Sequence, residues 1–204
     1  MKNKMILVGG FHEIFELIEK MDLKIEGVID NSLKDSIKGY RVIGNDSDMA
    51  RLYTKYLEQP LLITPDKPSI RKKLYRYYAK LGFSFSSLIS DEARISPSAS
   101  IGQGTIIQSG VMISSESRIG RFVKLNYNST IAHNVYLGDF TTVAPGAVLL
   151  GKVNIGANCY IGANATVLPG INICDNTIIG AGAVLTTDIT VQGTYAGIPA
   201  RSIN

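Results

Sequence analysis

Two histidines are the side chains best suited to proton-transfer chemistry in this 204-residue sequence. His12 follows a pair of glycines, and His133 lies in a segment rich in apolar residues. An imidazole titrates close to neutral pH, so it can remove a proton from an attacking nitrogen or oxygen. The two cysteines, Cys159 and Cys174, are too few for a disulfide framework or a four-cysteine zinc site. Proton transfer by histidine is therefore the chemistry to consider first.

The segment around His133 belongs to a repeat of six residues. From Ile95 onward every sixth residue is aliphatic, and seventeen consecutive positions fit without a gap: Ile95, Ile101, Ile107, Ile113, Ile119, Leu125, Ile131, Leu137, Val143, Leu149, Ile155, Ile161, Val167, Ile173, Ile179, Leu185 and Val191. The residue four positions after each is small or β-branched, and glycine often follows the aliphatic residue directly. Such a period predicts a parallel β-helix in which each hexad forms one short strand and one turn.

Three hexads close one triangular coil, so the repeat predicts a little over five stacked coils with the aliphatic side chains inside. Cys159 falls in an inward-facing series, and we expect an inert buried thiol there. His133 occupies the third position of its hexad, at a corner outside the core. Its counterpart one coil later is Gly151, which leaves space beside the ring. The pattern predicts an exposed base beside a shallow groove, and the alternative is a lone surface histidine.

The first ninety residues alternate strand-like and helix-like segments, which predicts βαβ units on a small parallel sheet. Strands are expected at 5–8, 25–29 and 61–63, and helices at about 11–19, 48–57 and 69–81. Ligands of such sheets bind beyond the carboxyl ends of the strands. Those ends carry the following residues: Gly9, Gly10, Phe11, His12, Asp30, Asn31, Thr64, Pro65 and Asp66.

Glycine after the first strand allows a phosphate to approach the backbone, next to the start of a helix. Asp30 can accept hydrogen bonds from a sugar hydroxyl. The alternative is a plain structural turn, in which His12 only caps the helix. Further along, Arg71-Lys72-Lys73 is interpreted as the solvated face of a helix.

Charge and composition exclude several classes of protein. Residues 1–90 carry 15 basic and 11 acidic side chains, whereas residues 91–204 carry 6 of each, so two different domains are expected. The net charge of +4 is too small to indicate a nucleic-acid partner, and tryptophan is absent. No apolar stretch reaches the roughly 18 residues of a membrane span, and no signal-peptide cleavage site is evident. We therefore expect a cytoplasmic protein with reduced cysteines and no membrane partner.

The repeat resembles the left-handed β-helix of the hexapeptide acyltransferase superfamily over residues 95–196. The whole chain resembles the bacterial nucleotide-sugar acetyltransferases, which include the bacillosamine and perosamine N-acetyltransferases and the sialic-acid O-acetyltransferases. The matching stretches are ILVGGFH, GVIDN, SIRKKLY, SLISDEARISPSASIG, LNYNSTIAHNVYLGDFTTVAPGAVLLGKVNIG and YAGIPAR. The resemblance implies a Rossmann-like α/β nucleotide-sugar-binding domain at 1–84 and a left-handed parallel β-helix acyltransferase domain at 85–204.

The resemblance also implies roles for individual residues. His133 matches the family's general base, and Asn134 stands where relatives often have a glutamate that orients the imidazole. Asn126 matches an asparagine near the acceptor, which joins the substrate-binding set Gly10, Phe11, His12, Asp30 and Asn31. The positions implied to bind acetyl-CoA are Thr142, Gly146, Gly151, Ala163, Ala181, Gly197 and Pro199, with Ala196 and Ala200 in the same ending. Relatives can carry histidine at Thr142. No metal is implied.

Acetyl transfer from acetyl-CoA to the amino group of a nucleotide-activated sugar is thus the expected activity. We expect a homotrimer with the active site between neighbouring β-helices, and an acceptor amine that contacts His133 and Asn126. The loops at 9–12 and 64–68 depart from the family pattern, so the acceptor half is altered. The alternatives are O-acetylation of a sugar not carried on a nucleotide and a non-catalytic trimeric scaffold. A metallo-hydratase of this fold needs three histidine ligands, but the repeat contains only His133.

Overall fold

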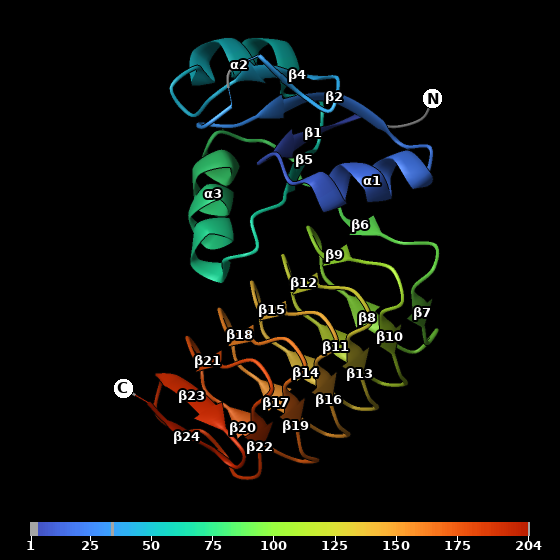
Figure 1. The fold of residues 1–204 in the computed structure, drawn as a ribbon. Coiled ribbons are helices and arrows are strands. Elements are labelled where there is room, and N and C mark those ends of the chain that lie inside the picture. The colour runs from blue at the N-terminus through green and yellow to red at the C-terminus, as the bar shows by residue number, and fades with distance from the viewer. Residues whose placement is uncertain (1–3, 34, 204) are drawn as a thin grey trace.

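The computed structural model describes residues 4–33 and 35–203, and the chain folds into an α/β part followed by a β-helix (Figure 1). The elements of the first part are β1 (Lys4–Val8), α1 (His12–Lys20), β2 (Lys24–Ile29), β3 (Ser36–Ile37), β4 (Tyr40–Gly44), α2 (Met49–Tyr56), β5 (Leu61–Ile63) and α3 (Pro68–Lys80). The expected strands and helices are confirmed to within one or two residues at most ends. The antiparallel hairpin of β3 and β4, which a two-residue turn connects, was not among the expected elements.

The sheet of the first part has the strand order β3-β4-β2-β1-β5, and β1 pairs in parallel with both β2 and β5. Alternate residues of each strand face opposite sides. Leu7, Val28 and Leu62 pack with α1, whereas Ile6, Ile29 and Ile63 pack with α2 and α3. The chain passes from β1 through α1 to β2, which lies on one side of β1. It later returns through α2 to β5, which lies on the other side of β1. The carboxyl ends of β1 and β5 therefore form the switch point where ligands of such sheets bind.

The β-helix consists of two-residue strands: β6 (Leu88–Ile89), β7 (Arg94–Ile95), β8 (Ser100–Ile101), β9 (Ile106–Ile107), β10 (Met112–Ile113), β11 (Arg118–Ile119), β12 (Lys124–Leu125), β13 (Thr130–Ile131), β14 (Tyr136–Leu137), β15 (Thr142–Val143), β16 (Val148–Leu149), β17 (Asn154–Ile155), β18 (Tyr160–Ile161), β19 (Thr166–Val167), β20 (Asn172–Ile173), β21 (Ile178–Ile179) and β22 (Val184–Leu185). A hairpin of β23 (Thr194–Gly197) and β24 (Ala200–Ser202) follows.

The strands form three sheets that run along the stack. One has eight strands from β6 to β24, one has six from β7 to β22, and one has five from β8 to β20. From β6 to β19 each strand pairs in parallel with the strand three elements later, so that Arg94 lies beside Met112 and Met112 beside Thr130. This register of eighteen residues confirms that three hexads make one coil. The sheets are the sides of a triangular prism, and the turns between them form its edges.

The turns need a left-handed backbone once in every hexad. Fourteen residues at six-residue intervals from Gly104 to Gly182 have φ between 55° and 76°. Ten of the fourteen are glycine or asparagine, the residues that adopt this conformation at least cost. Phe122 and Phe140 are exceptions on a single edge, where their rings stack with centroids 5.3 Å apart. Tyr75 of α3 packs against both rings, so the exceptions occur where the α/β part docks.

The repeat departs from its period at both ends. The β-helix begins at Ile89, one hexad before the first residue of the periodic series. At the other end the coil shortens, and Ile173 pairs with Ile189, sixteen residues later. Ile189 is 6% exposed, whereas Val191 is 67% exposed. The expectation that Val191 is the seventeenth inward residue is therefore wrong, because two residues are missing from the last coil. The other members of the series from Ile107 to Leu185 are buried, as is Cys159.

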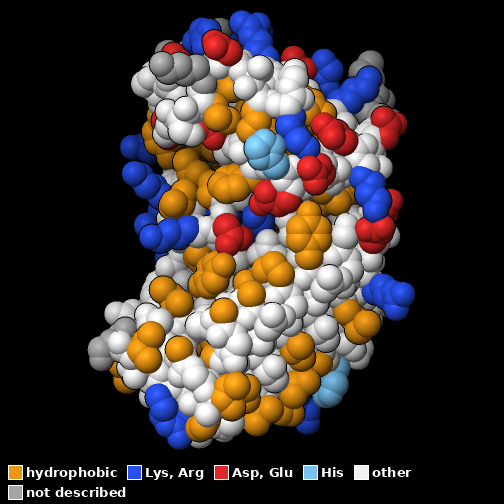
Figure 2. Space-filling view, in the orientation of Figure 1, with side chains coloured by type: hydrophobic (Ala, Val, Ile, Leu, Met, Phe, Trp, Pro, Cys, Tyr) orange, Lys and Arg blue, Asp and Glu red, His pale blue; other side chains and the backbone are white. Residues whose placement is uncertain are grey.

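Charged side chains are concentrated in the α/β part of the chain. Figure 2 shows Lys, Arg, Asp and Glu side chains gathered over the α/β part, and one histidine over each part of the molecule. Between residues 4 and 203, apart from position 34, no helix is both long enough and apolar enough to cross a membrane.

Candidate active site

The turn between β13 and β14 presents His133 and Asn134 on the edge between the six-stranded and five-stranded sheets. Both side chains are exposed, and Asn134 is one of the left-handed corner residues, with φ of 59°. His133 Nδ1 lies 2.9 Å from Asn134 Oδ1. An amide oxygen only accepts hydrogen bonds, so Nδ1 carries the proton and donates it to Asn134. The free lone pair is then on Nε2, as a general base requires.

Gly151 lies directly under the ring of His133 in the next coil. A Cβ atom placed on Gly151 would be 2.5 Å from His133 Nε2 and 2.7 Å from Cε1. Real Cβ contacts are almost never this short, so any side chain at this position would displace the imidazole. The sequence predicted space beside the ring at Gly151. The structure has this space, because residue 151 carries no side chain, and the imidazole ring of His133 fills it.

The glycines and alanines expected to bind acetyl-CoA lie on two edges of the prism. Gly151 shares an edge with His133, between the six-stranded and five-stranded sheets. Gly146, Ala163 and Ala181 stand in successive coils on the edge between the eight-stranded and six-stranded sheets. The six-stranded sheet separates the two sets. Within one chain they cannot line a single groove.

Thr142 and the C-terminal hairpin differ in accessibility. Gly197 and Pro199 form the exposed tip of the β23–β24 hairpin, next to the last coil of the eight-stranded sheet. Thr142 lies on the same sheet but is fully buried beneath the α/β part. Its Oγ1 donates to Asp66 O at 2.7 Å and accepts from Arg71 Nη2 at 2.8 Å. The expectation that Thr142 lines the coenzyme groove is wrong for this chain, because the docked domain covers it.

The residues expected to bind the nucleotide sugar bond mainly to one another. Asp30 Oδ2 accepts from Gly10 N at 2.9 Å, and Oδ1 accepts from Ser32 N, Ser32 Oγ and Leu33 N. Partial burial alone would raise the pKa of Asp30, but these hydrogen bonds outweigh it and lower the pKa below its ordinary value. Asp30 therefore ties the first loop of the sheet to the second.

The other residues expected to bind the nucleotide sugar in these loops are Asn31, Phe11 and His12. Asn31 exchanges two hydrogen bonds with Asp46, so it fixes a neighbouring loop. Phe11 occupies the N-cap of α1, and His12 is the first helical residue, with an exposed side chain. The interpretation of His12 as a cap is therefore incorrect.

The start of α1 and the loop after β5 meet the β-helix along a polar seam, which consists of Glu13, Asp66, Lys124, Asn126 and Tyr160. Lys124 Nζ is buried 3.4 Å from Asp66 Oδ1 and 3.6 Å from Glu13 Oε1, with the ring of Phe11 nearby. Asn126 Nδ2 donates to Asp66 Oδ1 at 3.3 Å and to Val143 O at 3.0 Å. The Tyr160 hydroxyl donates to Asp66 Oδ2 at 3.1 Å. Burial, and then Asp66, raise the pKa of Tyr160, which keeps this donor protonated.

Arg71 anchors the seam from α3. It is completely buried and donates to backbone carbonyls of Pro65, Asp66, Phe122 and Phe140 at 2.7–3.0 Å. Burial lowers the pKa of Arg71 to about 10, so the guanidinium stays charged at neutral pH. The interpretation of Arg71 as part of a solvated helix face is wrong. Lys72 beside it is half-buried and Lys73 is exposed, so the basic run gave no signal that one of its members is buried.

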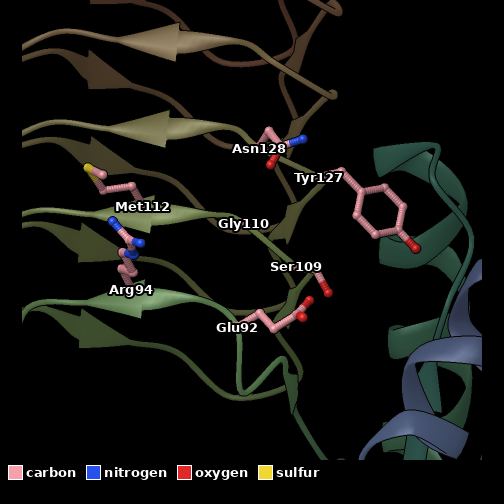
Figure 3. A pocket seen from close by; sticks show the side chains of 7 residues that line it. All are labelled: Glu92, Arg94, Ser109, Gly110, Met112, Tyr127 and Asn128. Atoms are coloured by element: carbon pink, nitrogen blue, oxygen red, sulfur yellow. The ribbon is translucent and has the colours of Figure 1, made fainter.

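Asn126 and His133 lie on different edges of the prism, so one chain does not bring them together. Beside the Asn126 edge is a hollow of about 490 Å³ lined by Glu92, Arg94, Ser109, Gly110, Met112, Tyr127 and Asn128 (Figure 3). Tyr127 points from the corner toward the helices of the α/β part, whereas Arg94 and Met112 lie along the outer face of the six-stranded sheet. One chain by itself therefore does not place Asn126 and His133 on the same edge, as the expected contact of one acceptor with both had suggested.

In the part of the chain that the structure describes, no three His, Cys, Asp or Glu side chains are grouped so that they could hold a metal ion.

Comparison with known proteins gives matches to both the repeat and the whole chain. Residues 152–187 match the family described as the hexapeptide repeat of succinyl-transferase. A histidine-to-alanine mutant of GDP-perosamine N-acetyl transferase from Caulobacter crescentus, in complex with CoA and GDP-perosamine, superposes with a TM-score of 0.93. It is 26% identical, and the match covers 100% of this chain and 98% of that one. The resemblance to hexapeptide-repeat sugar acetyltransferases is therefore confirmed, and the repeat supports a left-handed β-helix.

Two further matches define the range of the similarity. The acetyltransferase domain of PglB from Neisseria gonorrhoeae, in complex with acetyl coenzyme A, is 29% identical with a TM-score of 0.90, and the match covers 100% of both chains. An uncharacterized protein of Acanthamoeba polyphaga mimivirus is 32% identical over 120 residues, 58% of this chain. The chain spans about a quarter of the length of that relative, of which the match covers 23%.

Proposed function

We propose that this chain, whose repeat and whole-length fold are those of hexapeptide-repeat sugar acetyltransferases, transfers an acetyl group from acetyl-CoA to the amino group of a nucleotide-activated sugar. The observation that carries the proposal is the exposed pair His133–Asn134, with Nδ1 held at 2.9 Å from Oδ1 and the ring packed over Gly151, where no side chain displaces it. The likeness to an enzyme bound to CoA and GDP-perosamine supports the two substrates.

The chemistry follows from the protonation of His133. The amine of the acceptor attacks the thioester carbonyl, while Nε2 takes a proton from the attacking nitrogen. The tetrahedral intermediate then collapses with cleavage of the C–S bond, and the imidazolium returns the proton to the coenzyme A thiolate. Asn134 holds the ring in the required tautomer throughout. It is a neutral partner, so it stabilises the imidazolium less than a carboxylate would.

We further propose a homotrimer assembled through the six-stranded sheet. The outward residues of this sheet from β10 to β22 are small or apolar: Met112, Thr130, Val148, Thr166 and Val184. The five-stranded sheet instead exposes the polar residues Arg118, Asn154 and Asn172 together with Tyr136, and the α/β part covers much of the eight-stranded sheet. Closed threefold symmetry about the six-stranded sheet sets one edge of each subunit beside the other edge of its neighbour.

This arrangement supports a composite active site. The edge with Asn126, Gly146, Ala163 and Ala181 of one subunit would adjoin the edge with His133 of the partner subunit. Acetyl-CoA would lie in the groove between the two edges, and the hairpin tip at Gly197 would reach its far end. The acceptor would extend from the switch point of the α/β sheet, through the polar seam, to the partner subunit's His133. The separation of Asn126 and His133 within one chain supports this arrangement.

One observation favours the second candidate, O-acetylation of a sugar that is not carried on a nucleotide. Asp30 and Asn31, the residues expected to hold the ribose or base, are engaged in bonds within the chain. A Cβ atom on Gly10 would lie 2.6 Å from Leu33 Cδ1, so little space separates this glycine from the second loop.

A screen of acceptors separates the two candidates. Nucleotide-linked, lipid-linked and free sugars, with amino groups or with hydroxyls only, are incubated with acetyl-CoA, and release of the free thiol is followed. We expect turnover with a nucleotide-linked amino sugar. Acetylation of a free or lipid-linked sugar with no activity on any nucleotide sugar would establish the second candidate instead.

A further inference from the structure

The loop after β5 is the most tightly fixed segment of the polar seam. Arg71 Nη1 donates to Pro65 O at 2.9 Å and to Asp66 O at 2.7 Å, while Nη2 donates to Phe140 O at 2.7 Å. Thr142 Oγ1 adds a second donor to Asp66 O. One buried guanidinium thus joins the loop to two coils of the β-helix. The backbone of Asp66 is set in place by groups of both domains.

The side chain of Asp66 is also held by hydrogen bonds, yet it remains open on one side. Its carboxylate receives Asn126 Nδ2 and the Tyr160 hydroxyl, and Lys124 Nζ stands 3.4 Å away. The Asp66 side chain is 38% exposed, whereas the Lys124 side chain is 1% exposed. An ionised carboxylate has about four acceptor positions, so capacity for another donor remains on the exposed side.

We propose that Asp66 is a specificity-determining residue, whose carboxylate accepts a hydrogen bond from a hydroxyl or ammonium group of the acceptor sugar, and that Arg71 is its positioning residue. This inference rests on the proposed function and names a group that selects the acceptor. Asp66 follows β5 at the switch point of the sheet, and it contacts Asn126 on the edge of the β-helix proposed to adjoin the catalytic base.

The other polar groups of the seam are less suited to this role. Lys124 is buried between Asp66 and Glu13, so its charge serves to balance the carboxylates rather than to meet a ligand. The Asn126 amide nitrogen already donates to Asp66 and to Val143 O. Glu13 is charged and similarly exposed, but its contact in the seam is a 3.6 Å ion pair with Lys124, whereas the Asp66 carboxylate is oriented by hydrogen bonds from Asn126 and Tyr160. Fixed charged groups with locked supports are what selective binding sites require.

The test compares Asp66→Asn with the wild-type protein in the full chain, using the best sugar acceptor found by thiol release. Asparagine keeps the shape but removes the charge. Loss of a charge-assisted hydrogen bond corresponds to a rise of about 10- to 100-fold in the Michaelis constant for the acceptor. The constant for acetyl-CoA should stay within about twofold, because the Asp66 carboxylate bonds to Asn126 and Tyr160 and not to the glycine and alanine positions proposed to line the coenzyme groove. Glu58→Gln, which removes an exposed carboxylate elsewhere in the α/β part, is the matched control.

Arg71 is tested through its coupling to Asp66. Arg71→Lys keeps the charge but cannot supply the same set of donors, and we expect a higher Michaelis constant for the acceptor. Arg76→Lys, on the outer face of the same helix, is the control. In the double variant Asp66→Asn/Arg71→Lys the acceptor constant should match that of Asp66→Asn alone, because Arg71 acts through Asp66. A purely structural role would instead add a further loss.

The outcomes separate this inference from the proposed function. An unchanged acceptor constant for Asp66→Asn, in a wild-type protein that does acetylate a sugar, overturns the inference alone. A fall in turnover with both Michaelis constants unchanged also overturns it, since this reports only loss of folded enzyme. A wild-type protein that acetylates no sugar overturns the proposed function and the inference together.

Discussion

Gly151→Ala tests whether the position of the His133 ring matters for catalysis. The added methyl would lie 2.5 Å from Nε2, and ordinary contact begins at 3.4 Å, so the ring must move by about 0.9 Å to restore ordinary contact. Displacement of a catalytic group by about 1 Å can cost roughly 100-fold in rate. We expect kcat to fall by about 10- to 100-fold.

The fold should tolerate this substitution. Gly151 is not among the residues with positive φ, so alanine introduces no backbone strain, and the clash is with a side chain at the surface. Gly→Ala at a compatible position stabilises a protein by about 0.4–1 kcal/mol through the unfolded state. The melting temperature should therefore be unchanged or slightly raised.

The assay is thiol release at saturating acetyl-CoA, with the acceptor concentration varied and thermal unfolding followed in parallel. The control places Gly151→Ala in a His133→Ala background, where the methyl has no ring to displace. There it should cost no further activity. The reasoning is refuted if Gly151→Ala turns over at the wild-type rate, or if it lowers the residual rate of the double variant by the same factor as it lowers the wild-type rate.

Three further predictions concern the tautomer, the core and the assembly. Asn134→Asp keeps a residue that tolerates the left-handed corner and places a carboxylate beside Nδ1, which favours the imidazolium. The acid limb of the pH profile of kcat/KM should move to higher pH, and an unmoved limb would show that Asn134 does not contact the working ring. Burial raises the pKa of Cys159 to about 11, so at pH 8 only about one thiol in a thousand is ionised. A thiol reagent should modify Cys174 alone in the native protein and both cysteines in denaturant; rapid native modification of Cys159 would contradict a closed core. Met112→Lys adds three charges near the proposed threefold axis and should yield monomers by light scattering, whereas Tyr136→Lys, at similar exposure on the five-stranded sheet, should not. Trimers in both variants would place the interface elsewhere.

Much of the β-helix could be predicted because its physics is local and periodic. An inward aliphatic residue in each hexad, with glycine or asparagine at the corner, fixes the coil length and the side of the chain on which His133 emerges. The same periodicity fails at Val191, since the last coil loses two residues. The sequence pattern does not reveal this shortening, because Val191 stands six residues after Leu185 and so continues the period of aliphatic residues.

The contacts between the two domains could not be predicted in the same way. Thr142 and Arg71 meet across about seventy residues of sequence, and neither a threonine on a strand nor an arginine in a basic run indicates a buried hydrogen bond. Asp66 was identified as a strand end, but its importance depends on Asn126, Lys124 and Tyr160 from two coils. Phe122 and Phe140 did carry a signal, because aromatic residues at left-handed corners require a compensating partner.

The most direct test of the account is the rate of acetyl transfer by His133→Ala, measured together with its affinity for acetyl-CoA by calorimetry. Loss of a general base typically lowers the rate by about 10²–10⁴-fold. His133 is exposed at a corner outside the core, so its removal should spare the fold, the assembly and the dissociation constant for acetyl-CoA. Near-normal turnover of this variant, with the same affinity, would contradict the assignment of His133 as the base.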